Sequence, residues 1–134
     1  MEHDQHNKKK VILVDDDREF IAMFSMGLAE QYDIRAFSSG QECLELLMTR
    51  KFIPDIFFLD VHLEWGHGFD LSKKIKQMPA FQKIPVVFIS GDSESYEEAF
   101  NLGAFTFLPK PFDLASLTGI IEEAGQTDIV VDES

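Results

Sequence analysis

The sequence has little cysteine: Cys43 is the sole one among 134 residues. A single thiol cannot form a disulfide within the chain, and so low a cysteine content is typical of proteins from a reducing compartment. We therefore expect a cytoplasmic protein that is stabilised by a buried apolar core. A chain of this length is long enough to build such a core as one domain.

Long apolar runs are also missing. No segment approaches the roughly 20 apolar residues that a membrane-spanning helix needs. The first ten residues, MEHDQHNKKK, contain no apolar stretch of the kind found in secretory signal peptides. The sequence thus predicts neither a membrane association nor secretion, and residues 1–7 are expected to form a disordered polar leader.

Positive charge is scarce, since 24 acidic residues face 12 basic ones and the formal net charge is -12. Nucleic-acid binding requires a basic surface, so we expect no nucleic-acid partner. The one lysine run, residues 8–10, is interpreted as a solvated strand entrance. His3 and His6 in the leader have no third ligand nearby, which argues against a zinc site there.

What the sequence does have is a regular alternation of apolar runs and amphipathic helical patterns. Continuous apolar runs are typical of parallel strands that are buried on both faces. Five such strands alternating with five helices predict an α/β domain over residues 8–125, a doubly wound parallel sheet with helices on both faces. An acidic tail is expected over residues 126–134. The strands are predicted at residues 11–15, 32–37, 55–60, 86–90 and 104–108.

Polar side chains follow four of the five predicted strands. Ligands of open α/β sheets bind beyond the carboxyl ends of the strands. We therefore expect these side chains to converge at one edge of the sheet. They are Asp15 and Asp16 after the first strand, Asp60 at the end of the third, Ser90 at the end of the fourth and Lys110 after the fifth.

Clustered carboxylates repel each other, by several kcal/mol for two charges about 4 Å apart at an effective dielectric constant of about 20. A hard divalent cation such as Mg²⁺ would offset this repulsion, because it prefers oxygen ligands. Beside such an ion, Asp60 is suited to accept a phosphoryl group as a carboxylate nucleophile. Lys110 would supply a second positive charge and Ser90 a hydrogen bond. Asp17, the third aspartate of the first run, is interpreted as a helix N-cap.

Together these residues resemble the receiver domains of bacterial two-component response regulators. VILVDDD at residues 11–17 matches the first strand and acidic pair of that family, and DIFFLD at residues 55–60 matches its third strand. The Lys-Pro pair of the family corresponds to Lys110-Pro111. The resemblance covers roughly residues 8–124 and implies a stand-alone, flavodoxin-like (βα)5 fold with strand order 2-1-3-4-5, similar to the chemotaxis receiver.

The resemblance also implies roles for individual residues. Asp60 corresponds to the phospho-acceptor, with Lys110 and Ser90 as catalytic partners. Ser90 and Phe107 correspond to the switch residues, although the family more often has tyrosine in place of Phe107. The implied activity is a phosphorylation-dependent signalling switch that catalyses only its own phosphorylation and dephosphorylation.

A Mg²⁺ site is implied by the same correspondence. Its ligands would be the carboxylates of Asp15, Asp16 and Asp60 and the backbone carbonyl of His62, with the His62 ring facing solvent. The Lys110-Pro111 peptide bond is expected to be cis, as it usually is in the family.

The implied partners are proteins. A histidine kinase or a phosphotransfer protein would donate the phosphoryl group. A downstream protein target would bind the face formed by the fourth helix, the fifth strand and the fifth helix. Phe100, Phe105 and Phe107, near that face, are expected to lie mostly in the core.

The loop after Asp60 departs from the family pattern. Glu64 stands where the family usually has proline, whereas Gly68 matches its loop glycine. Trp65 lies in this loop, and we expect it to be partly exposed, either as a sensor of the site or as an anchor for a partner. Asp92, like His62, occupies a variable flanking position.

Two other functions are compatible with parts of this pattern. A small Mg²⁺-dependent phosphohydrolase with an aspartate nucleophile usually needs an acid/base aspartate two residues later, where this chain has His62. It also needs a cap or a deep pocket, for which the chain is short. The second alternative, a degenerate receiver that serves only for docking, is disfavoured because the acidic pair, Asp60, Ser90 and Lys110 are all intact.

Overall fold

The structure, a computed structural model, describes residues 8–63, 67–91, 95–110 and 112–133, with side chains as far as residue 125. Its strands are β1 (Lys9–Val14), β2 (Tyr32–Phe37), β3 (Ile56–Asp60), β4 (Val86–Ser90) and β5 (Thr106–Pro109). Its helices are α2 (Arg18–Leu28), α3 (Gly40–Thr49), α4 (Gly68–Lys76), the 3-10 helix η1 (Pro79–Phe81), α5 (Tyr96–Asn101) and α6 (Leu114–Glu133).

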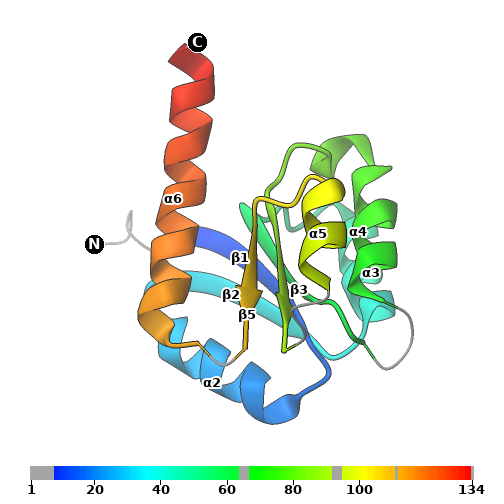
Figure 1. Ribbon diagram of the computed structural model, residues 1–134, viewed down its shortest axis with the longest axis vertical. Helices are drawn as coiled ribbons and strands as arrows, with labels where there is room; N and C mark the ends of the chain where they lie inside the picture. Colours follow the sequence, from blue (N-terminus) through cyan, green and yellow to red (C-terminus); the bar gives the residue numbers. More distant parts are fainter. Residues whose placement is uncertain (1–7, 64–66, 92–94, 111, 134) are drawn as a thin grey trace.

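The strands form one parallel sheet in the order β2-β1-β3-β4-β5 (Figure 1). This confirms the predicted flavodoxin-like, doubly wound fold. Val14 pairs with Phe37 on one side and Leu59 on the other, while Asp60 pairs with Ile89. The carboxyl ends of β1, β3 and β4 are therefore aligned at one edge of the sheet, as the topology requires of a ligand site.

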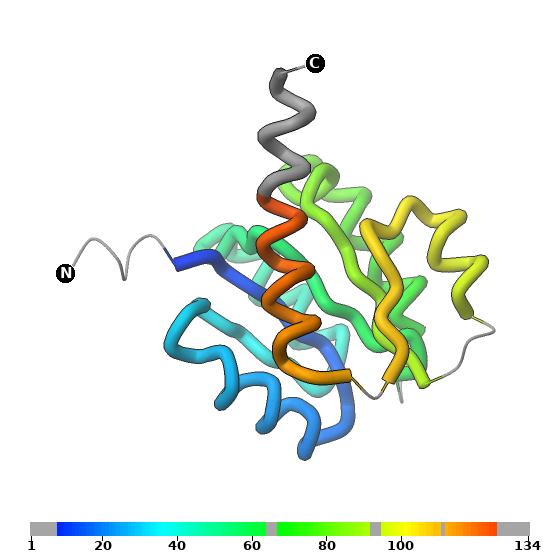
Figure 2. Tube along the Cα trace, turned by 60° about the vertical axis from the view of Figure 1, so that its left-hand side comes forward, coloured from blue at the N-terminus to red at the C-terminus, as the bar shows by residue number. Residues whose placement is uncertain are grey.

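Helices cover both faces of the sheet. Figures 1 and 2 place α2 and α6 on one face and α3, α4 and α5 on the other. Successive strand residues point to opposite faces, so the sheet contributes to two separate apolar cores. The first core includes Leu13, Phe24, Phe58, Leu117 and Ile121. The second includes Val14, Cys43, Leu59, Phe69 and Ile75.

The last helix is longer than the sequence pattern suggested. α6 continues to Glu133, through most of the stretch expected to be an acidic tail. The division into leader, domain and tail stays a prediction, because residues 1–7 lie outside the described part of the chain. None of the helices in the described part is long and apolar enough to cross a membrane.

Candidate functional site

Three carboxylates meet at the carboxyl edge of the sheet, where the sequence placed them. Asp15 and Asp16 follow β1, and Asp60 is the last residue of β3. One carboxylate oxygen from each of the three lies within 4.8 Å of the others. Asp15 is fully buried, Asp60 is 6% exposed and Asp16 is half-buried. So dense a set of negative charges, so far from water, needs positive charge nearby.

The chain turns sharply after Asp15, which directs this side chain into the site. The backbone N–H of Asp15 still donates to Phe37 of β2 at 3.0 Å, so the residue is held at the end of the strand ladder. Asp15 Oδ1 then accepts the backbone N–H of Asp17 at 2.9 Å. Asp17 in turn caps α2, accepting the N–H groups of Glu19 and Phe20 at 3.0 and 3.2 Å. The interpretation of Asp17 as an N-cap is confirmed.

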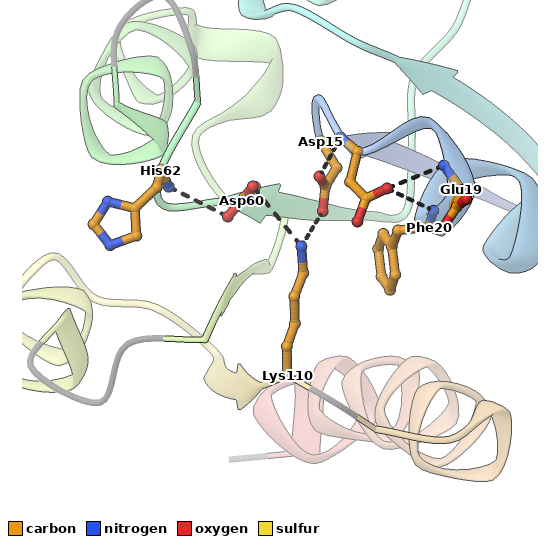
Figure 3. Close-up of polar contacts among 7 residues, drawn as sticks. Asp15, Glu19, Phe20, Asp60, His62 and Lys110 are labelled. Atoms are coloured by element: carbon orange, nitrogen blue, oxygen red, sulfur yellow. Dashed lines mark hydrogen bonds and ion pairs between the residues drawn. The ribbon is translucent and has the colours of Figure 1, made fainter.

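Lys110 reaches into the acidic cluster from the end of β5 (Figure 3). Its Nζ lies 2.9 Å from Asp15 Oδ2 and 3.9 Å from Asp60 Oδ2. Its backbone N–H donates to the carbonyl of Ser90 at 2.9 Å, which ties β5 to β4 at this edge. Burial lowers the pKa of Lys110, but the negative charges of Asp15 and Asp60 raise it overall. The ammonium group is therefore held in its charged form.

The Asp60 carboxylate lies in surroundings that disfavour its charged form. Its Oδ1 accepts the backbone N–H of His62 at 3.2 Å. Burial and the neighbouring charge of Asp15 raise the pKa of Asp60 to about 6, although Lys110 and the His62 N–H oppose the shift. At neutral pH the carboxylate is ionised but poorly compensated. Such a group favours any arriving cation and is an available nucleophile.

The cluster fits Mg²⁺ by the chemistry of its donors. All three side chains offer carboxylate oxygens, which this ion prefers. Asp15 Oδ2 is buried and accepts no hydrogen bond of good geometry within the described residues, where Lys110 is its ion-pair partner. Lone pairs at this atom are thus available for a metal ion. The backbone carbonyl of His62 as a further ligand stays a prediction.

Gly68, the first residue of α4, packs tightly against the backbone of Asp60. The N–H of Gly68 donates to the carbonyl of Val61 at 2.9 Å, and a Cβ atom at position 68 would collide with the carbonyl oxygen of Asp60. Only glycine allows so close a backbone approach. Sequence comparison with the family pattern pointed to Gly68, but not to this reason. The departures at Glu64 and Trp65 lie outside the described residues.

Ser90 and Phe107 lie on the neighbouring strands β4 and β5. Ser90 is fully buried at the end of β4, while Phe107 is half-buried on β5. The Phe107 ring meets the ring of Tyr96 edge-on, with centroids 5.6 Å apart, and Tyr96 stacks on Phe100 at 6.0 Å. The expectation that Phe100 belongs to the core is wrong, because this side chain is 68% exposed. Phe105 is half-buried.

Asp92 and Pro111 lie outside the described residues, so the geometry of the Lys110-Pro111 bond stays a prediction. The His62 ring is exposed, as expected, and its centroid lies 5.8 Å from that of His67. In Figure 3 the ring points away from Asp60, toward which only the backbone N–H is directed.

Sequence reasoning missed one side chain of the site. Phe20 recurs with Phe24 and Leu28 at helical spacing, which predicts only a place in the core, yet its ring centroid lies 4.7 Å from Lys110 Nζ. Its helical spacing carried no signal for this contact, which joins residues far apart in the chain.

Residues 11–122 match the family described as response regulator receiver domain. The chain is 35% identical over 109 residues to a "Probable cyclic di-GMP phosphodiesterase" of Vibrio cholerae, and 30% identical over 115 residues to the "DNA-binding transcriptional regulator NtrC" of Escherichia coli K12. These alignments cover 80% and 85% of this chain but 24% of each relative. The chain thus spans about a quarter of the length of these relatives.

Solved structures show the same fold. The chemotaxis response regulator CheY4 of Vibrio cholerae aligns with a TM-score of 0.78 at 24% identity, covering 88% of this chain and 99% of that one. The non-phosphorylated HemR receiver domain of Leptospira biflexa aligns with a TM-score of 0.76 at 28% identity, covering 87% of this chain and 94% of that one.

Proposed function

This chain belongs to the response regulator receiver family, and from that premise we propose that it is a signalling switch phosphorylated on Asp60. The donor is the phosphohistidine of a histidine kinase or of a phosphotransfer protein. One observation supports the assignment of Asp60 above all. Its buried carboxylate, with a raised pKa, shares one edge of the sheet with the Asp15 and Asp16 carboxylates and the Lys110 ammonium.

In the transfer, a carboxylate oxygen of Asp60 attacks the phosphorus atom. The new O–P bond forms as the P–N bond to the donor imidazole breaks, and the imidazole nitrogen leaves with the electron pair and takes up a proton. Mg²⁺ held by Asp15, Asp16 and Asp60 would neutralise charge on the phosphoryl oxygens. The Lys110 ammonium, 3.9 Å from Asp60 Oδ2, supplies a second positive charge and binds a phosphoryl oxygen.

The response to phosphorylation starts at Ser90. Its hydroxyl group moves toward the phosphoryl oxygens, and Phe107 fills the space that it leaves. Contact between Phe107 and Tyr96 supports this route, because it links the sheet edge to the exposed surface of α5. A downstream protein binds there, on the face formed by α5, β5 and α6. A coupling of about 1–3 kcal/mol is typical of such switches.

The hydrolase alternative has no support at the position where it needs a side chain. An acid/base group two residues after Asp60 would be His62, whose ring points away from Asp60 (Figure 3). The docking-only alternative is disfavoured because the acidic cluster and Lys110 are assembled. We propose that the chain acts on no other substrate and catalyses only its own phosphorylation and dephosphorylation.

The test is phosphorylation by a small phosphodonor, such as acetyl phosphate, in the presence of Mg²⁺. The protein should gain one phosphoryl group that is stable in acid and labile in base, as an acyl phosphate is. Asp60→Asn should abolish the modification. Asp70→Asn, which changes an exposed carboxylate on α4, should leave it intact.

Two results would contradict the proposal. Modification on a serine or histidine side chain would remove the protein from this functional class. Rapid multiple turnover of phosphate esters would favour the hydrolase.

A further inference from the structure

The ammonium group of Lys110 has a neighbour that carries no charge. Its Nζ lies 4.7 Å from the centroid of the Phe20 ring, within the range of a cation–π contact. Figure 3 shows this ring and the Asp60 carboxylate on opposite sides of the ammonium group. Phe20 lies in the first turn of α2, whereas Lys110 directly follows β5. The ammonium therefore lies between an aromatic face and the acidic cluster.

The orientation of the Phe20 ring is itself fixed. The backbone N–H of Phe20 donates to the capping side chain of Asp17 at 3.2 Å. The ring meets Phe112 edge-on at 5.4 Å, and its centroid is 5.9 Å from that of Phe24. A ring held at its backbone and by two aromatic neighbours loses little further freedom when it binds a cation. The contact with Lys110 is thus prepared by the fold.

Beside the Lys110 ammonium, an aromatic face suits the site better than another carboxylate would, since Asp15 and Asp60 already pair with it. Lysine has a long, flexible stem, so its charged end needs several contacts to stay in one place. The ammonium group has three N–H donors, and the carboxylate of Asp15 engages it at 2.9 Å. An aromatic face attracts the charge without consuming a donor in a strong hydrogen bond. Donors are therefore left for the oxygens of an incoming phosphoryl group.

We propose that Phe20 is a positioning residue for the phosphorylation of Asp60: its ring holds the Lys110 ammonium where the phosphoryl oxygens arrive. This inference rests on the proposed function, and it adds a residue that acts through Lys110 without touching the reacting atoms. The competing explanation is that Phe20 only fills space between α2 and Phe112. The two explanations differ in one property, since packing depends on the shape of the ring and cation binding on its electrons.

The experiment changes the electrons and keeps the shape. Pentafluorophenylalanine, incorporated at position 20 alone, preserves the ring but removes the negative face that attracts cations. We expect the rate of phosphorylation by acetyl phosphate with Mg²⁺ to fall about three- to tenfold, the range of a cation–π contact of this kind. Phe20→Leu should give a similar loss, and Phe20→Tyr, which retains the π face, should restore most of the rate.

Phe24 provides the matched control. It lies one turn later on α2 and packs against Phe20 and Phe58. The same fluorinated residue at position 24 should leave the rate unchanged. A second measurement is the NMR shift of the Lys110 ε-methylene and ammonium protons. The Phe20 ring current should move these signals upfield in the wild type, and Phe20→Leu should abolish that displacement.

The outcomes distinguish a failure of the proposed function from a failure of the role of Phe20. A wild type that acetyl phosphate does not modify would overturn the proposed function. If the wild type is phosphorylated and the folded pentafluorophenylalanine variant at position 20 reacts at the same rate, the role of Phe20 is refuted. The proposed function would then still stand. If Phe20→Leu does not fold, the fluorinated variant still decides, because its ring occupies nearly the same space.

Discussion

Replacing Asp60 with asparagine should stabilise the folded protein in the absence of divalent metal, although it removes the proposed phospho-acceptor. Burial and the charge of Asp15 raise the pKa of Asp60 from 3.8 to about 6. At pH 8 the folded state therefore carries an ionised carboxylate at a place that favours the neutral form. Asparagine is similar in size and uncharged, and its side-chain oxygen can still accept the N–H of His62.

The size of the effect follows from the pKa. One pKa unit corresponds to about 1.4 kcal/mol, so ionised Asp60 costs the folded state about 3 kcal/mol at pH 8. The sign follows from proton uptake. The pKa of Asp60 is higher in the folded state than in the unfolded state, so the folded state binds the proton more tightly. The contribution of Asp60 to folding stability is therefore fully present below pH 3.8 and is lost as the pH rises through about 6. The advantage of Asp60→Asn should thus shrink to roughly half at pH 5.

Urea unfolding in a metal chelator, at pH 8 and at pH 5, measures this difference. Asp60→Asn should show a higher free energy of unfolding than the wild type at pH 8, and a smaller advantage at pH 5. Glu30→Gln, which neutralises an exposed carboxylate on the surface, is the control and should change little at either pH. An Asn variant no more stable than the wild type at pH 8, or an equal advantage at both pH values, would refute the reasoning.

Three further predictions concern the same edge of the sheet. Millimolar Mg²⁺ should raise the melting temperature of the wild type by mass action and much less that of Asp16→Asn; an unchanged wild type would contradict the acidic metal site. Ser90→Ala should still be phosphorylated on Asp60, but with a smaller change in amide exchange over α5, and equal responses would refute the switch. Gly68→Ala should destabilise the fold by about 1–3 kcal/mol, because its Cβ collides with the Asp60 carbonyl. Gly119→Ala, in open space on α6, should be neutral or stabilising in the same thermal melts.

The fold was predictable because its central strands, such as β3 and β4, are buried on both faces. Such strands appear in the sequence as continuous apolar runs, and the observed bounds Val86–Ser90 agree with the predicted ones. The length of α6 was not predictable in the same way. The acidic composition after Gly125 suggested a tail, but the stretch contains neither glycine nor proline to end a helix. Composition predicts solubility of a segment better than it predicts where a helix stops.

The acidic cluster was predictable for a topological reason. Parallel strands bring their carboxyl ends to one edge, so strand-end residues such as Asp15 and Asp60 must be neighbours once the strand order is known. The place of Phe20 depends instead on the distance between a helix and the tip of a lysine that follows β5. Gly68 depends on the approach of two backbone segments. The Phe20–Lys110 distance has no signature in residue type or spacing. The glycine at position 68 permits a close approach, but the sequence does not say which backbone it meets.

The aromatic residues of α5 show why helical spacing alone does not predict burial. Tyr96, Ala99 and Phe100 do share one face of a helix, yet only Ala99 is fully buried, while the two rings are 54% and 68% exposed. The helix is short, six residues, and meets the sheet through its small residue, so the large rings project beyond the core. They cover one another by stacking, and the edge of Tyr96 meets Phe107. An inward movement of Phe107 would therefore remove a contact of Tyr96 and disturb the stack. The exposure that spacing could not predict places two aromatic rings on the face where we propose that a partner protein binds, so the partner would meet a different surface in each state of the proposed switch.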